Sequence, residues 1–231
     1  MNPILKLAIR EKRNLTEAES YSLLSGYGIS VPKYLVAYSE KEATEAGEKL
    51  GFPLVMKIIS PDIIHKSNLG GVAMNIINSL QIKKAYKNII SQVREKRPDA
   101  KIDGILLYKQ APKGVEVIVG MIRDPQFGPT VMFGLGGIFV EILKDVSFRV
   151  CPVDRNDIDE MLTETEGIKM LQGYRGQPRR DVNAISKIIM RVSKLALDYS
   201  VITEIDLNPI IVYEKGAIVV DAKVFLNKNL N

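Results

Sequence analysis

The chain has 231 residues, of which 46% are hydrophobic and 26% charged. This composition predicts one large globular domain or two packed lobes, and it excludes a disordered chain, which would have fewer apolar residues and a more one-sided charge. The net charge of +5 is spread along the chain without a basic block, so nucleic-acid binding is disfavoured.

Cys151 is the only cysteine, which excludes an intrachain disulfide and a cysteine-based zinc site and suits a reducing compartment. The first 14 residues mix basic with apolar side chains and lack the apolar core of a signal peptide. The longest apolar stretch, residues 129–143, is shorter than the roughly 20 residues that a membrane span needs. We therefore expect a cytoplasmic location without a membrane partner.

Helical signals recur along the chain. Two capping boxes, Thr16 with Glu19 and Ser39 with Glu42, each predict the start of a helix. Apolar periodicity and the breaks at glycine and proline set the other limits. The expected helices cover residues 1–14, 16–26, 39–51, 80–97 and 181–199, and two more begin near residues 154 and 166.

Strand-like runs alternate with the helices up to about residue 104 and cluster after it. The expected strands cover residues 32–36, 54–59, 72–77, 105–110, 115–122, 130–133 and 147–150, followed by a hairpin of residues 204–212 and 217–224. Residues 60–71 are expected to form a polar loop. The pattern predicts an α+β fold with a smaller lobe of residues 25–105, a larger lobe of residues 1–24 with 106–231, and a ligand cleft between them.

The glycines argue against two common phosphate loops. No Gly-Lys pair occurs, so the usual P-loop is absent. The cluster Gly134-Leu135-Gly136-Gly137 is not a dinucleotide fingerprint, because Phe139 stands at the third glycine position and no helix clearly follows. Because the cluster directly follows a strand, its bare amides could approach an anion; the alternative is a tight turn.

The C-terminal hairpin offers oxygen ligands for a metal ion. Strand alternation puts the side chains of Glu204, Asp206 and Asn208 on one face. Mg²⁺ prefers such oxygens and shares its other positions with water and phosphate. Asp221 is the candidate second carboxylate, and it reaches the face of Asn208 with a two- or four-residue turn but not with a three-residue turn. The alternative is the polar outer face of an exposed hairpin.

Lys57 lies inside the apolar run of residues 54–59. A lysine in such a run is costly to bury without an anion, so it either extends to solvent or meets a ligand such as phosphate. A lysine on an edge strand is the alternative.

His65 is the only histidine in the chain. A lone histidine is usually a surface or core residue, but this one lies in a loop bounded by Pro61 and a glycine pair, beside Lys66 and Ser67. Imidazole is partly neutral near pH 7 and nucleophilic, so it can accept and return a phosphoryl group. A Ser-His-Asp triad or a histidine-metal site in this chain would have to use it.

Taken together, these segments resemble the β-type subunits of ADP-forming acyl-CoA synthetases, also called ADP-forming acetate–CoA ligases, which contain an ATP-grasp domain. The similarity covers nearly the whole chain. The segments that carry it are Gly51-Phe52-Pro53-Leu54-Val55-Met56-Lys57, Asp62-Ile63-Ile64-His65-Lys66, Arg123-Asp124-Pro125-Gln126-Phe127-Gly128, Gly134-Leu135-Gly136-Gly137 and Glu204-Ile205-Asp206-Leu207-Asn208-Pro209.

This resemblance implies a reversible reaction in which acyl-CoA, ADP and phosphate give the free acid, CoA and ATP. A separate CoA-binding α-type subunit would carry a first phosphohistidine, within a hetero-oligomer expected to be α2β2. His65 would take the phosphoryl group from that subunit, move on its loop and deliver it to ADP. Asp206 would orient His65 or stabilise its cation.

The resemblance also implies the ligand-binding residues. Lys57 would contact the nucleotide phosphates, and Asn208 and Asp221 would bind Mg²⁺. The segment Leu106 to Gln110 would lie at the adenine hinge, and its Tyr108-Lys109-Gln110 lacks the acidic residue often found there in the family. The other residues expected to line the nucleotide site are Leu107, Tyr108, Gln110, Glu116, Gly136 and Gly137, with Glu141 as a further polar residue of the cleft.

Three alternatives stay open. An ATP-grasp ligase that joins a carboxylate to an amine or thiol would need no mobile phosphohistidine. A succinyl-CoA synthetase β subunit usually carries an additional C-terminal domain. A non-catalytic regulatory subunit would bind ADP without becoming phosphorylated.

Overall fold

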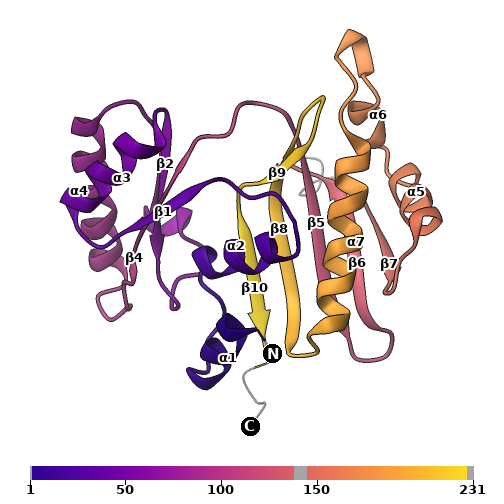
Figure 1. Ribbon diagram of the computed structural model, residues 1–231, viewed down its shortest axis with the longest axis horizontal. Helices are drawn as coiled ribbons and strands as arrows, with labels where there is room; N and C mark the ends of the chain where they lie inside the picture. Colours follow the sequence, from indigo (N-terminus) through magenta and orange to yellow (C-terminus); the bar gives the residue numbers. More distant parts are fainter. Residues whose placement is uncertain (1, 138–144, 228–231) are drawn as a thin grey trace. The chain divides into compact units, whose positions relative to one another are not determined.

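The computed structural model describes residues 2–137 and 145–227. The chain divides into two compact units, each of which is described by itself (Figure 1). Unit 1 combines Met1–Val31 with Lys113–Asn231, and unit 2 is Pro32–Pro112. The lobe boundary expected at residue 105 falls inside a strand that pairs on both sides within unit 2, so unit 2 continues to Pro112. The α+β class is confirmed.

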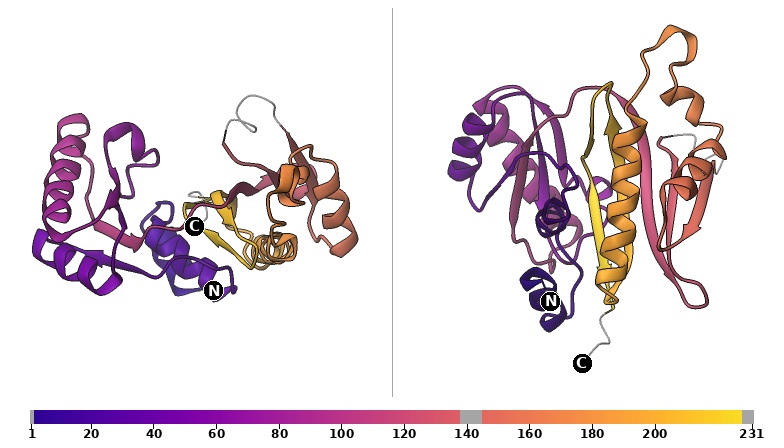
Figure 2. Two further views of the ribbon diagram at one scale, coloured as in Figure 1. Left: turned by 90° about the horizontal axis from the view of Figure 1, so that it is seen from above. Right: turned by 45° about the vertical axis from the view of Figure 1, so that its right-hand side comes forward.

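Unit 2 is a four-stranded antiparallel sheet in the order β1-β4-β2-β3 with two helices on one face (Figure 2). Its strands and helices are β1 (Tyr34–Ala37), β2 (Leu54–Ile59), β3 (Val72–Ile76), β4 (Gly104–Lys109), α3 (Glu40–Leu50) and α4 (Ser79–Lys96). Leu54, Met56 and Ile58 of β2 belong to the hydrophobic core beneath the helices. Side chains alternate along a strand, so Val55, Lys57 and Ile59 point to the opposite face, away from the two helices.

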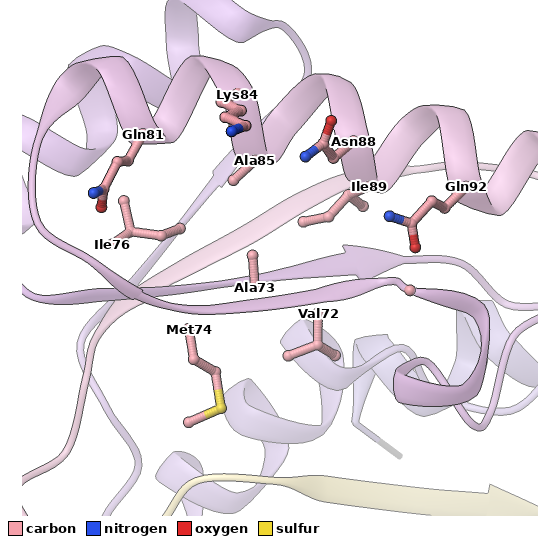
Figure 3. A pocket seen from close by; sticks show the side chains of 11 residues that line it. Val72, Ala73, Met74, Ile76, Gln81, Lys84, Ala85, Asn88, Ile89 and Gln92 are labelled. Atoms are coloured by element: carbon pink, nitrogen blue, oxygen red, sulfur yellow. The ribbon is translucent and has the colours of Figure 1, made fainter.

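Helix α4 and strand β3 enclose a groove of about 300 Å³ (Figure 3). The strand lines it with apolar side chains, and the helix presents polar side chains to it, among them Gln81, Asn88 and Gln92. None of the residues that line this groove was expected to bind nucleotide, so the groove is separate from the predicted site.

Unit 1 is built on a six-stranded antiparallel sheet in the order β10-β8-β5-β6-β7, with β9 paired to β8. Its strands are β5 (Val115–Asp124), β6 (Gly128–Leu135), β7 (Val146–Val150), β8 (Ile202–Val212), β9 (Ala217–Val219) and β10 (Ala222–Leu226). Helix α7 (Val182–Asp198) packs against β5, β6 and β8 and buries Ile185, Ile189 and Val192. Asp181 caps this helix and accepts a hydrogen bond from the amide of Gly216, which fixes the turn after β8.

The remaining short elements are α1 (Pro3–Arg10), α2 (Glu17–Gly26), η1 (Ser67–Leu69), α5 (Arg155–Thr163), α6 (Ile168–Leu171) and η3 (Tyr174–Gly176). The first helix ends earlier than expected, because Lys12 takes a left-handed conformation with φ of 53°. No described helix has both the length and the apolar character that a membrane crossing requires.

The two capping boxes have different outcomes. At α2 the box is confirmed, since the Thr16 amide donates to Glu19 Oε2 at 2.8 Å and the Glu19 amide donates to Thr16 Oγ1 at 3.4 Å. At α3, Ser39 caps the helix, but the Glu42 carboxylate accepts from the amide of Tyr38, one residue before the cap. The second box is therefore only half formed.

Candidate functional site

The polar face of strand β8 is confirmed. Ile205 and Leu207 are buried on the side of the unit 1 core, whereas Asp206 and Asn208 are partly exposed on the other side. Asp206 pairs with Gly120 of β5 on one side and with Lys223 of β10 on the other. The alternation of the sequence therefore predicted correctly which side chains this sheet leaves outside its core.

The position of Asp221 follows from the turn between β8 and β9. The pair Val212↔Ala217 closes a four-residue turn. The pair Leu207↔Ala222 continues in the same register after a break in the strand at Asp221. This register sets Asp221 opposite Asn208, whose amide donates to the Asp221 carbonyl at 3.2 Å. The turn is thus one of those that bring Asp221 to the face of Asn208, and the two candidate ligands are neighbours.

Lys223 joins the two carboxylates, and the sequence analysis did not identify it. Its Nζ lies 2.8 Å from Asp206 Oδ2 and 3.8 Å from Asp221 Oδ2. Burial by itself would lower the pKa of Lys223, but the hydrogen bond to Asp206 and the charges of Asp206, Asp221 and Glu17 outweigh burial and leave the pKa above its ordinary value. The two carboxylates therefore converge on a cation that the chain itself provides.

The donor set suits a metal ion that brings most of its own ligands. In the described part of the chain, no group of three or more His, Cys, Asp or Glu side chains is placed to hold a metal. Asn208 and Asp221 nevertheless lie opposite each other, and each has a hard side-chain oxygen. Such a site fits Mg²⁺ whose other ligands are water and nucleotide phosphates.

Glu116 and the glycine pair lie together at the ends of β5 and β6. The Gly136 amide donates to the Glu116 carbonyl at 2.8 Å. A Cβ at residue 136 would lie 2.9 Å from Glu116 Cβ, and Gly137 has φ of 69°, so both positions require glycine. Gly134 and Leu135 belong to β6, which corrects the expectation of one tight turn over the whole cluster. Glu141 lies outside the described residues.

Lys57 is buried in the middle of the unit 2 sheet, with 7% of its surface exposed. Strand β2 pairs with β3 and β4, so the edge-strand alternative is wrong. The Lys57 Nζ lies 5.5 Å from the centroid of the Tyr108 ring, a cation–π arrangement. Lys57 and Tyr108 thus share the face that no helix of this unit covers.

Two of the residues expected at the adenine hinge, Leu107 and Gln110, have structural roles in unit 2. Leu107 is fully buried in the core beneath the helices, so its side chain is withheld from a ligand on the Lys57 face. The Gln110 side-chain amide accepts from the Asn75 amide at 2.8 Å and donates to Asn75 Oδ1 at 2.9 Å. Asn75 has φ of 57°, and Gln110 holds this irregular point of β3 in place.

His65 is exposed near the centre of a loop whose two ends are anchored. Ile63 is 4% exposed in the unit 2 core, and Leu69 packs against the same core. Beyond His65, the Asn68 carbonyl accepts from Lys96 Nζ at 3.1 Å. His65, Lys57 and Tyr108 belong to unit 2, whereas Asp206, Asn208 and Asp221 belong to unit 1.

Comparison with known proteins supports one family. Residues 7–226 match the model of an ATP-grasp domain. The β subunit of ADP-forming acetate–CoA ligase I from Pyrococcus furiosus is 50% identical over 223 residues, 96% of each chain. ADP-forming acetate–CoA ligase I from Archaeoglobus fulgidus is 42% identical over 98% of this chain, which spans only 33% of that longer protein.

Solved structures agree with this result. A chain of acetyl-coenzyme A synthetase 1 from Ca. Korarchaeum cryptofilum, in complex with coenzyme A and Ca-AMPCP, has a TM-score of 0.93 and 45% identity over 96% of this chain and 98% of its own. A second structure of that enzyme, with coenzyme A and Mg-AMPPCP, has its phosphohistidine segment pointing towards the nucleotide-binding site. It has a TM-score of 0.84 and 41% identity, and the match covers 97% of this chain and 98% of its own.

A domain match along nearly the whole chain and a full-length relative with half of its residues identical lead to one conclusion. The chain belongs to the ATP-grasp family, as a β subunit of the ADP-forming acetate–CoA ligases, whose nucleotide-binding part works with an α subunit.

Proposed function

We propose that His65 receives a phosphoryl group from a phosphohistidine of the CoA-binding α subunit and transfers it to ADP. In the first step the N–P bond on the α subunit breaks as an N–P bond to His65 forms. In the second step that bond breaks as an O–P bond to the β-phosphate of ADP forms, which gives ATP and neutral imidazole. The reverse sequence consumes ATP.

The exposure of His65 on an anchored loop is the observation that carries this proposal. The imidazole lies outside the core, so either ring nitrogen can be reached by a phosphorus centre. Buried Ile63 and partly buried Leu69 hold the loop ends against the core, and His65 between them is exposed. The phosphohistidine segment reported for the Korarchaeum enzyme supports the same assignment.

The other residues bind and neutralise the nucleotide in this proposal. Lys57 and the amide of Gly137 contact the phosphates, because a buried ammonium and a backbone amide at a glycine favour anions, whereas the Gly136 amide already donates to the Glu116 carbonyl. Asn208 and Asp221 hold Mg²⁺, which would neutralise phosphate charge in the reaction. Phosphoryl transfer depends mainly on such positioning and charge neutralisation.

Three further residues complete the nucleotide site. Tyr108 and Gln110 lie along and after β4, where they line the nucleoside side of the site. Glu116 is exposed beside the glycine pair and is a polar neighbour of the phosphates.

We also propose that the complex is an α2β2 hetero-oligomer in the cytoplasm and that Asp206 orients His65 during transfer.

Replacing His65 with asparagine tests the shuttle. With the α subunit, acyl-CoA, phosphate and Mg-ADP present, His65→Asn should abolish ATP formation and the incorporation of acid-labile phosphate into this chain. Its affinity for Mg-ADP should stay within about twofold of wild type, because the imidazole is not a nucleotide ligand in this proposal. Substantial ATP formation by the variant would favour a ligase that makes its acyl phosphate without a phosphohistidine.

A further inference from the structure

Lys223 treats the two carboxylates beside it differently. It lies directly opposite Asp206 in the β8–β10 ladder and makes its hydrogen bond to that residue, at 2.8 Å. Asp221 precedes Lys223 by two residues in the chain, and its Oδ2 lies farther from Lys223 Nζ, at 3.8 Å. The side chains of Lys223 and Asp206 are only 21% and 30% exposed, so water screens this pair weakly.

The arrangement leaves a small net negative charge at the candidate metal position. Asp206 and Asp221 each contribute one negative charge, Lys223 cancels one of them, and the buried Glu17, whose charge also acts on Lys223, adds a weaker contribution. A free divalent cation approaching Asp221 would meet an ammonium group about 4 Å from its ligand, which opposes binding. A cation that arrives on a nucleotide brings phosphate oxygens of its own and depends less on protein charge.

We infer that Lys223 is a positioning residue that keeps Asp206 out of the metal's coordination, so that the site accepts Mg²⁺ with a nucleotide and rejects the free ion. This inference rests on the proposed metal site at Asn208 and Asp221. It gives the two aspartates separate tasks: Asp221 binds the metal, and Asp206 stays a carboxylate available to the histidine. The lysine achieves this by occupying the Asp206 oxygen that a metal would otherwise take.

A purely structural role for Lys223 gives a different expectation. If the lysine only fastened β10 to β8, its removal would lower the stability of the chain without strengthening metal binding. If it excludes the free ion, its removal should tighten metal binding, since Asp206 then becomes a second carboxylate ligand. The sign of the change in metal affinity separates the two roles.

The experiment titrates the full chain with Mn²⁺ in the absence of nucleotide and measures free Mn²⁺ by electron paramagnetic resonance. Lys223→Met should bind Mn²⁺ about tenfold more tightly than wild type. The double variant Lys223→Met, Asp206→Asn should return to the wild-type affinity. Lys194→Met is the matched control, because it also removes a lysine paired with an aspartate, Asp198 at 3.2 Å, but on the exposed surface of α7; it should change nothing.

Further variants keep the result decisive. If Lys223→Met does not fold, Lys223→Gln removes the ammonium charge but keeps a donor for Asp206, so it should still tighten Mn²⁺ binding, by less than tenfold, because only the repulsion near Asp221 is lost. Unchanged or weaker Mn²⁺ binding by the folded Lys223 variant overturns the inference. Asp221→Asn tests the site beneath it: weaker Mn-ADP binding by this variant preserves the proposed metal site even when the lysine inference fails, whereas unchanged Mn-ADP binding overturns both.

Discussion

Lys57 is the proposed phosphate contact of unit 2. Its side chain is buried in an interior strand, and the face of the Tyr108 ring lies 5.5 Å from its ammonium. A phosphate carries full negative charge and stabilises an ammonium more strongly than an aromatic face does. A phosphate bound on this face would therefore interact with a cation that water screens only weakly.

Replacing Lys57 with methionine should weaken Mg-ADP binding by tenfold or more, roughly 1.4 kcal/mol, because a phosphate loses its cation. Methionine keeps the unbranched apolar stem, so the fold should survive the change. Isothermal titration calorimetry measures the affinity. Lys83→Met, on the exposed side of α4, is the control for net charge. Equal affinities for wild type and the Lys57 variant would contradict a phosphate contact.

The sequence predicted the orientation of candidate site residues where their own strand determines it. Asp206 and Asn208 follow from alternation along one strand, and they lie on the expected face. Lys223 was missed because its partner is set by the register between β8 and β10, which depends on the turn after β8 and on the break just before β10. Leu107 was assigned to the nucleotide because a segment cannot show which of its faces the helices cover.

At the scale of elements, two glycines determine the path of the chain at the C-terminal end of the loop around His65. Gly70 has φ of 72° and ends the short helix η1, and a Cβ there would lie 1.7 Å from Gln92 Oε1 of α4. Gly71 follows, and its carbonyl accepts from the Ile58 amide at 2.8 Å. Two glycines in succession therefore return the chain to β3: a side chain at Gly70 would displace the Gln92 side chain, and one at Gly71 would meet Ile58 Cγ2 at 2.6 Å.

Gly70→Ala should lower the free energy of unfolding by about 1 kcal/mol for the left-handed conformation at φ 72° and ψ 18°, and by a further amount for the contact with Gln92. The matched control is the same change in a Gln92→Ala background, which keeps the conformational cost and removes the contact. The difference between the two losses measures the displacement of Gln92. Urea unfolding of wild type, both single variants and the double variant gives these values; equal losses for Gly70→Ala in the two backgrounds would refute the close contact.

Local signals predicted the elements more reliably than their ends. Strand β2 was predicted with its observed bounds, and the Thr16–Glu19 box predicted the start of α2. Helix α1 was predicted too long because nothing in its composition shows that Lys12 leaves the helical region. The box at Ser39 is half formed because Glu42 can reach more than one amide, and the choice depends on the backbone before the cap.

At the scale of the whole molecule, the sequence predicted two lobes but not how each sheet is ordered. In unit 2 the last strand, β4, inserts between β1 and β2. This pairing joins residues far apart in the chain, so no local pattern encodes it. The boundary moved from residue 105 to Pro112 for the same reason, since β4 belongs to the sheet that it completes.

The proposed function assigns Lys57 of unit 2 and Asn208 and Asp221 of unit 1 to the same nucleotide, so Mg-ADP should protect peptides of both units. Hydrogen–deuterium exchange followed by mass spectrometry should show slower exchange on addition of Mg-ADP in the peptide that contains Lys57 of β2 and in the peptide that contains Asp221, with helix α5 unchanged as an internal reference. In the double variant Asn208→Ala, Asp221→Ala, protection should disappear from both units, because one lost metal site weakens the binding of one shared ligand. Protection confined to a single unit would show that the nucleotide is held by that unit alone, and the other set of proposed contacts would then have to be abandoned.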